Sequence, residues 1–246
     1  QEHQTAVTTL ASTMKPKVCQ TIAVIAGVTK RATAWLIHTT STVDVWATVA
    51  AGVVNATSIK ILRPDAMVHT ATLLAYDSEY DVAFISTATT DQTPMELLVS
   101  GWVQAPAQGT KVFIVGCPHT DKFSFISGEV SDSGSLPEVV YLSHSRTYVI
   151  MNATVHPGTF GAPVVDNDGK VVGMCREVVV SNTYNDVLET ISFAVPSWVL
   201  YRHLLRIQQG ATGNVSALWK PEVLFAPATI PASGKWYGLA VTSMTA

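Results

Sequence analysis

The sequence has few charged residues. Asp, Glu, Lys and Arg make up 13% of its 246 residues, about half the roughly 25% of an average globular protein. The formal net charge is -3, so no basic field favours nucleic acid, and we expect none as a direct partner. Few charges and a mean hydropathy of +0.28 are typical of a surface covered by another protein, and equally of a lineage bias towards Ala, Thr and Val.

The sequence also lacks long apolar runs and paired cysteines. No stretch approaches the roughly 18 to 20 apolar residues that a membrane-spanning helix requires, so we expect no membrane span. Cys19, Cys117 and Cys175 show no CxxC spacing and lie in apolar segments, which predicts three buried free thiols. Zinc-ligand spacing is missing as well, and we expect neither a metal nor a cofactor. The histidines considered for such a site are His38, His69, His119, His144 and His203.

What the sequence does contain is a long succession of short strand-like segments. They are rich in Val, Ile, Thr and aromatic residues, and polar, Gly, Pro or Asp breaks separate them. The first series is predicted at residues 18–28, 33–38, 45–54, 58–62, 68–76 and 82–86. The second series is predicted at residues 110–117, 123–130, 139–142, 148–151, 162–165, 170–180 and 191–194. Two runs of about six strands indicate an all-β chain of two packed barrels, joined around residues 87–109.

Two local signals stand out against this background. The run Asp-Asn-Asp-Gly at residues 166–169 predicts a hairpin between two strands of the second series. After Pro196, apolar residues recur at helical spacing at positions 200, 204 and 207. We expect a helix there, with Ser197 as its N-cap and Gly210 as its stop.

Four ordered segments resemble those of HtrA/Deg-type members of the trypsin-like serine protease family. Residues 14–18 are similar to the family's opening Lys-Pro-x-Val strand, and residues 76–83 to its Asp-x-x-x-Asp-Leu-Ala motif. Residues 155–169 resemble the Asn-Pro-Gly-Asn-Ser-Gly-Gly-Pro-Leu-Val segment around the nucleophile, and residues 191–197 the Gly-Phe-Ala-Ile-Pro-Ser junction. The resemblance implies two six-stranded antiparallel β-barrels of the trypsin-like type, followed by a C-terminal helix and an extended tail.

The resemblance also implies a domain organisation. We expect an N-terminal tail at 1–13, a trypsin-like pseudoprotease domain at 14–209 with lobes at about 14–100 and 108–200, and a C-terminal extension at 210–246. Residues 235–241 resemble the opening strand of a PDZ domain, of which the extension is expected to hold at most this start. Residues 1–13 contain no aromatic residue, which argues against the homotrimer that HtrA-type proteases form through N-terminal aromatic side chains.

The positions that carry catalysis in the family differ here. By the resemblance, Gly52 occupies the position of the general-base histidine, Phe160 that of the nucleophilic serine, and Asp81 that of the orienting carboxylate. A benzyl group cannot attack a carbonyl and a glycine cannot accept a proton, so covalent attack and proton transfer are lost together. We therefore expect no catalytic residue. The vestigial triad positions are Gly52, Asp81 and Phe160, and the vestigial oxyanion loop is Gly158 and Thr159.

Each of these residues has a structural role to weigh against a functional one. We expect Asp81 to accept backbone hydrogen bonds, Gly158 to serve a tight turn, and the ring of Phe160 to fill space left by the missing imidazole. His156 lies next to the altered loop, and we expect a surface residue there instead of a substitute base.

Three functions remain open on the sequence. The first is a catalytically inactive homologue that serves as a structural or scaffolding subunit of a larger protein assembly. The second is a non-cleaving peptide-binding or chaperone-like module, which requires an open cleft beside Phe160. The third is an active hydrolase with an atypical site around Asp81, Thr159 and His156. The unpaired cysteines favour an organellar, mitochondrial location over a secreted or periplasmic one.

Overall fold

The computed structural model describes residues 2–89, 92–98, 106–117, 123–133, 148–156, 158–176, 180–181, 186–187, 192–216, 223–225 and 241–244. The helices are α1 (Glu2–Met14), α2 (Ser197–Gln208) and the short 3-10 helices η1 (Lys15–Lys17) and η2 (Ala50–Gly52). The strands of the first lobe are β1 (Val18–Ile25), β2 (Val28–Thr39), β3 (Val43–Val49), β4 (Ala56–Leu62), β5 (Val68–Asp77) and β6 (Val82–Ala88). Those of the second lobe are β7 (Lys111–Gly116), β8 (Ser124–Ser133), β9 (Val149–Met151), β10 (Pro163–Val165), β11 (Val171–Cys175) and β14 (Ser192–Pro196). The remaining strands are β12 (Val180–Ser181), β13 (Asp186–Val187), β15 (Gly213–Asn214), β16 (Val223–Phe225) and β17 (Val241–Met244).

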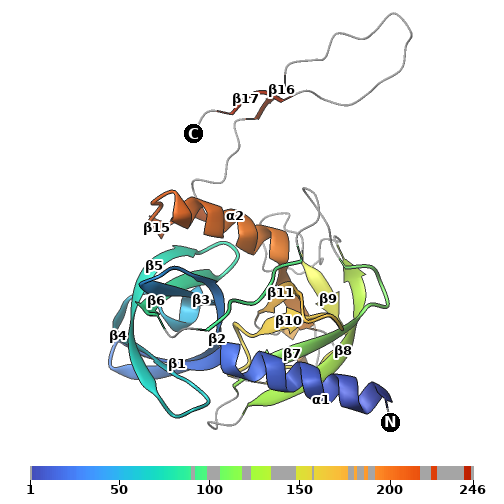
Figure 1. Cartoon of the computed structure of the whole chain (residues 1–246). Coiled ribbons are helices and arrows are strands. Elements are labelled where there is room, and N and C mark those ends of the chain that lie inside the picture. Colours follow the sequence, from blue (N-terminus) through green and yellow to red (C-terminus); the bar gives the residue numbers. More distant parts are fainter. Residues whose placement is uncertain are drawn as a thin grey trace, which may run out of the picture.

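Two antiparallel β-barrels lie side by side (Figure 1). In the first, neighbouring strands follow the order β5-β4-β1-β2-β3-β6, and pairing of β5 with β6 closes the ring. In the second, the order is β10-β11-β14-β9-β8-β7, and β10 pairs with β7. The prediction of two six-stranded barrels followed by a helix is therefore confirmed. The strand expected at residues 139–142 lies outside the described residues.

Three apolar clusters account for the packing of the barrels. Trp46 lies in the cluster inside the first barrel and Ile114 in the cluster inside the second. The third cluster fills the seam between the lobes, where Trp35 and Phe84 of the first lobe meet Phe113 of the second. All of these side chains are buried, and each such burial contributes roughly 1.5 to 3 kcal/mol before the entropy of ordering is subtracted.

The strand predicted across residues 18–28 is wrong at its end. β1 and β2 form a hairpin through Ala26 and Gly27, both of which have positive φ, at 50° and 78°. A two-residue turn of this kind matches the right-handed twist of the strands it joins. The hairpin at residues 166–169 forms as predicted, and the Asp166 carboxylate accepts the backbone N–H groups of Asp168 and Lys170.

The helices differ from the prediction in two details. Residues 1–13 were expected to form a tail, yet helix α1 covers Glu2–Met14. Its residues Leu10 and Met14 lie against Gly169 in the β10–β11 turn, so docking on the second barrel stabilises it. The N-cap of α2 is Pro196 instead of Ser197. The Ser197 hydroxyl instead donates to the carbonyl oxygen of Leu98 at 2.7 Å.

The C-terminal extension is described only in part. β15 runs parallel to β5, and β16 pairs with β17. The strand predicted in this region overlaps β17 at Val241, and the other residues of the expected PDZ start, 235–240, lie outside the described ranges. Of the helices in the described ranges, none combines the length and the apolar character that crossing a bilayer requires.

Candidate functional site

The segments that carry Gly52, Asp81 and Phe160 meet at the seam between the lobes. Gly52 ends η2, directly after β3, and Asp81 precedes β6. Phe160 lies in the loop between β9 and β10, and its carbonyl oxygen accepts the N–H of Thr33 in β2 at 2.9 Å. The next residue, Gly161, lies against the end of β3: a Cβ built on it would be 3.1 Å from the backbone nitrogen of Val49. The fold thus gathers the three predicted positions in one place.

The carboxylate of Asp81 is used by the backbone of the first lobe. Its Oδ1 accepts the N–H of Ala51 at 2.7 Å, and its carbonyl oxygen accepts the N–H of Ala50 at 3.1 Å. Asp81 itself has φ +56°, a left-handed conformation that Asp tolerates better than most residues. These bonds hold η2, and with it Gly52, against the turn before β6. The sequence analysis expected this carboxylate to accept backbone hydrogen bonds, and it accepts one from Ala51.

Gly52 has room for a side chain. Of the described residues other than its chain neighbours, Ala32 and Val49 alone have atoms within 4 Å of a Cβ built on Gly52, each at 3.4 Å. Phe160 is therefore not in contact with that Cβ position. Its half-buried ring packs against the seam cluster and the interior of the second barrel. An imidazole would extend beyond this Cβ, so the expectation that the Phe160 ring fills the space of a missing imidazole stays a prediction.

The loop that carries Phe160 is tightly bonded to itself. Thr159 is fully buried, and its hydroxyl donates to the carbonyl oxygen of His156 at 2.6 Å while accepting that residue's N–H. Gly158 has φ +95°, as a tight turn requires. Pro157, which completes the motif, lies outside the described residues.

These hydrogen bonds bear on the third function considered from the sequence, an active hydrolase with an atypical site. The Thr159 hydroxyl is bound to backbone, and His156 is exposed. Among the described residues, the imidazoles that make polar side-chain contacts are His38, with Gln208, and His203, with Asp77. Neither of these contacts involves a hydroxyl or a thiol. The structure therefore brings no nucleophile and base together around Asp81 in the described part of the chain.

Two of the three cysteines are not poised to act as nucleophiles. Cys19, Cys117 and Cys175 are buried and do not form disulfides, as predicted. Burial raises the pKa of the Cys175 thiol to about 12. Burial, and next the neighbouring Cys117, raise the pKa of Cys19 well above its ordinary value, against a weaker opposing effect of Arg63. Because the thiolate is the reactive form, neither thiol is poised for attack at neutral pH.

Thr33 connects the two lobes beside the Phe160 loop. Its hydroxyl donates to the carbonyl oxygen of Gly158 at 2.7 Å and accepts the N–H of Cys117 at 2.9 Å. Its N–H donates to Phe160, as described above, and its carbonyl oxygen accepts the Thr48 hydroxyl at 2.8 Å. One buried threonine of the first lobe thus bonds three backbone groups of the second lobe, which fixes the loop at the seam.

A buried acid–imidazole pair was missed on the sequence. Nε2 of His203, on α2, lies 2.9 Å from Oδ2 of Asp77, and both side chains are almost fully buried. Burial by itself raises the pKa of Asp77, but the contact with His203 and the N–H groups of Tyr80 and Glu79 together hold it below its ordinary value. The Asp-x-x-x-Asp spacing that identified Asp81 was the one available signal for Asp77.

Comparison with known proteins places this geometry in context. Residues 28–174 match the sequence model of a family described as Trypsin-like peptidase domain. The chain is 30% identical over 146 residues to Serine protease HTRA1 of Xenopus laevis, covering 59% of this chain and 30% of that protein. It is 27% identical over 162 residues to a probable periplasmic serine endoprotease DegP-like of Marinomonas sp., covering 65% of this chain and 32% of that protein. The chain thus spans about a third of the length of these curated relatives.

Solved structures agree on the fold. A protease of M. tuberculosis in its active form superposes with a TM-score of 0.69 at 19% identity, over 84% of this chain and 86% of that one. The HtrA-type protease AlgW, solved with a tripeptide, gives a TM-score of 0.70 at 18% identity, over 84% of this chain and 64% of that one.

Proposed function

Because the chain belongs to the trypsin-like peptidase family and is an HtrA-family serine protease homologue, we propose that it is a catalytically inactive member that serves as a structural subunit of a larger protein assembly. The observation that carries the proposal is the pairing of Gly52 with Phe160 at the positions of base and nucleophile. The surviving acid, Asp81, is bound to the N–H of Ala51. Without base and nucleophile, the remaining acceleration from an oxyanion site is roughly 10³ to 10⁴ over water.

Exposed apolar residues support the assembly part of the proposal. Tyr201 and Leu205 stand four residues apart on the outer side of α2, each 38% exposed. Met67, in the β4–β5 connection, and Val68, the first residue of β5, are each 56% exposed. Apolar side chains grouped on a surface are typical of protein contact sites. Free thiols fit a reducing compartment, and we extend the proposal to an organellar, mitochondrial location.

Peptide binding without cleavage is the second candidate. It is favoured by the fold shared with AlgW, whose structure was solved with a tripeptide. This function requires an open groove beside Phe160 that holds an extended segment, and the loss of the proton-transfer groups would leave that segment intact.

Inactivity is tested with the purified full chain. Unfolded casein and a fluorophosphonate probe are added to wild type, to Asp81→Ala and to Gly52→His/Phe160→Ser. We expect neither turnover nor labelling in wild type and Asp81→Ala. Gly52 has no positive φ, and its Cβ position makes ordinary contacts, so the double variant is expected to fold and is the matched positive control. Turnover in wild type that disappears in Asp81→Ala would show that the chain is an enzyme.

The assembly is tested on material from the native source. We expect the protein to elute from a sizing column far above the mass of a monomer, together with other proteins. Elution as a monomer would contradict the scaffolding role. A monomer that binds unstructured peptides without cutting them would favour the second candidate.

A further inference from the structure

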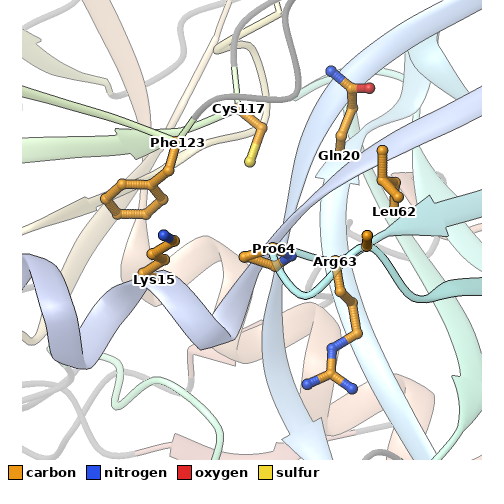
Figure 2. Close-up of a pocket in the computed structure, with 8 residues that line it drawn as sticks. Lys15, Gln20, Leu62, Arg63, Pro64, Cys117 and Phe123 are labelled. Atoms are coloured by element: carbon orange, nitrogen blue, oxygen red, sulfur yellow. The ribbon is translucent and has the colours of Figure 1, made fainter.

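A cavity of about 560 Å³ lies between the two lobes, away from the residues of the vestigial triad. The first lobe contributes Lys15 of η1, Gln20 of β1 and Arg63, directly after β4. The second lobe contributes Cys117 and Phe123, at the ends of β7 and β8 that face each other. Figure 2 shows Lys15, Cys117 and Phe123 on one side of the cavity and Gln20 and Leu62 on the other. Its volume is in the range of small-ligand pockets.

The charge of the lining is positive. Lys15 is exposed, and no ion pair neutralises it within the described residues. Arg63 also lines the cavity, but its Nη2 lies 3.4 Å from the Asp65 carboxylate, and its guanidinium points away from Phe123 in Figure 2. The described lining contains no Asp or Glu. One positive charge, on Lys15, is therefore available to an anion.

The remainder of the lining is suited to an apolar body. The Phe123 ring and the side chains of Leu62 and Pro64 form walls. Gln20 is buried, and its Oε1 accepts the Arg31 guanidinium at 2.6 Å, so its acceptor already has a strong partner. Ligand pockets commonly combine apolar walls with a few polar groups that fix orientation. A ligand that fits this lining has one acid group and an adjoining aromatic or branched aliphatic part.

We propose that this cavity binds a carboxylate attached to an apolar body, with the carboxylate at Lys15 and the body against Phe123 and Leu62. Two sources share this chemistry: a free small organic acid, and an acidic residue beside an apolar one in a polypeptide. The site is independent of whether the chain has lost protease activity.

The cavity is connected to the loop that carries Phe160. The N–H of Cys117, in the cavity wall, donates to the Thr33 hydroxyl, and that hydroxyl donates to the carbonyl oxygen of Gly158. Thr33 also donates its own N–H to the carbonyl oxygen of Phe160. Two hydrogen bonds through the Thr33 hydroxyl thus link the cavity wall at Cys117, where a ligand would bind, to Gly158 of the vestigial oxyanion loop.

The test measures binding to the full chain by titration calorimetry. The probes are 3-phenylpropionate and its neutral counterpart 3-phenylpropanol, and the dipeptides acetyl-Phe-Glu-amide and acetyl-Phe-Gln-amide. We expect at least one acid to bind saturably and about five-fold more tightly than its neutral counterpart. Binding of 3-phenylpropionate alone identifies a free acid as the ligand type, and preferential binding of the Glu peptide identifies a polypeptide.

Two lysine variants locate the binding site. Lys15→Gln is expected to abolish the preference for the acid, because it removes the available charge from an exposed position without disturbing the core. Lys17→Gln is the matched control, since Lys17 belongs to the same 3-10 helix but does not line the cavity. Absence of saturable binding, equal affinity for acid and neutral probes, or equal effects of the two variants would overturn the proposal.

Discussion

His203 of α2 and Asp77 of β5 form a buried imidazole–carboxylate pair that joins the C-terminal helix to the first barrel, with Nε2 and Oδ2 2.9 Å apart. Asp77 also accepts the N–H groups of Glu79 and Tyr80 at 2.7 and 3.0 Å. It therefore shapes the turn that leads to Asp81. The pair therefore fixes helix α2 and the turn that carries Asp81 relative to the first barrel.

Removing the charge of Asp77 is expected to destabilise the fold. Asp77→Asn replaces the carboxylate that contacts the fully buried His203 and accepts two N–H groups, and hydrogen bonds to a charged group contribute about 1.5 to 3 kcal/mol each. Chemical denaturation measures the free energy of unfolding. Asp168→Asn is the control, because Asp168 is exposed, and we expect a change below about 0.5 kcal/mol. Equal effects of the two variants would show that the pair contributes nothing to stability.

The same pair predicts that the free energy of unfolding decreases in acid. The pKa of Asp77 lies below 3.8 in the folded protein, so the folded state binds its proton less readily than the unfolded chain. The stabilisation is complete above the unfolded-state pKa and is lost as the pH falls through the lower folded-state value. Denaturation of wild type and Asp77→Asn between about pH 5 and about pH 2 is expected to show curves that converge at the acid end. Parallel curves would contradict this assignment.

Gly161 is expected to tolerate no side chain. It has φ +85°, and a Cβ there would overlap the carbonyl oxygen of Thr33, a backbone atom that cannot move aside. Gly27 is the matched control, with φ +78° and no atom of the described structure within 4 Å of its Cβ position. Left-handed backbone costs Ala roughly 1 to 2 kcal/mol. We expect Gly27→Ala to lose about that amount, and Gly161→Ala to lose clearly more, in thermal and chemical denaturation.

Thr33→Val tests the connection between the lobes. Valine keeps the shape of threonine but leaves the carbonyl oxygen of Gly158 and the N–H of Cys117 without the hydroxyl. A buried polar group left unpaired costs about 1 to 3 kcal/mol, so we expect a loss of at least about 2 kcal/mol. Hydrogen exchange at the Cys117 amide is expected to accelerate. Thr29→Val, at an exposed position of β2, is the control and is expected to change neither quantity.

The architecture could be predicted because it rests on repeated local patterns. Short β-rich segments with polar breaks, counted along the chain, led to two barrels. The hairpin at Ala26 and Gly27 was missed because apolar and β-branched residues continue on both sides of it, so a single glycine was the only signal. Helix α1 was missed because its Thr-rich sequence has little helical preference of its own. Docking of Leu10 and Met14 on the second barrel is a tertiary effect that local patterns do not contain.

The candidate site likewise has features that the sequence predicts and contacts that it does not. The positions of Gly52 and Phe160 follow from flanking motifs, whose register is local. The bonds of Asp81 to Ala51, and of Thr33 to Gly158 and Cys117, join segments that are distant in the chain. The same holds for Asp77 and His203. Such contacts depend on how the barrels pack, and no spacing along the sequence reports them.

The contact of Gly161 with the backbone of β2 and β3 has a consequence for how such chains are recognised. A loop that packs between two lobes needs glycine wherever a Cβ would meet the neighbouring backbone, whatever chemistry the loop performs. The glycines of a peptidase motif can therefore be retained for packing between the barrels, independently of any reaction. A match to that stretch attests to a shape, and only the side chains it displays can attest to an activity.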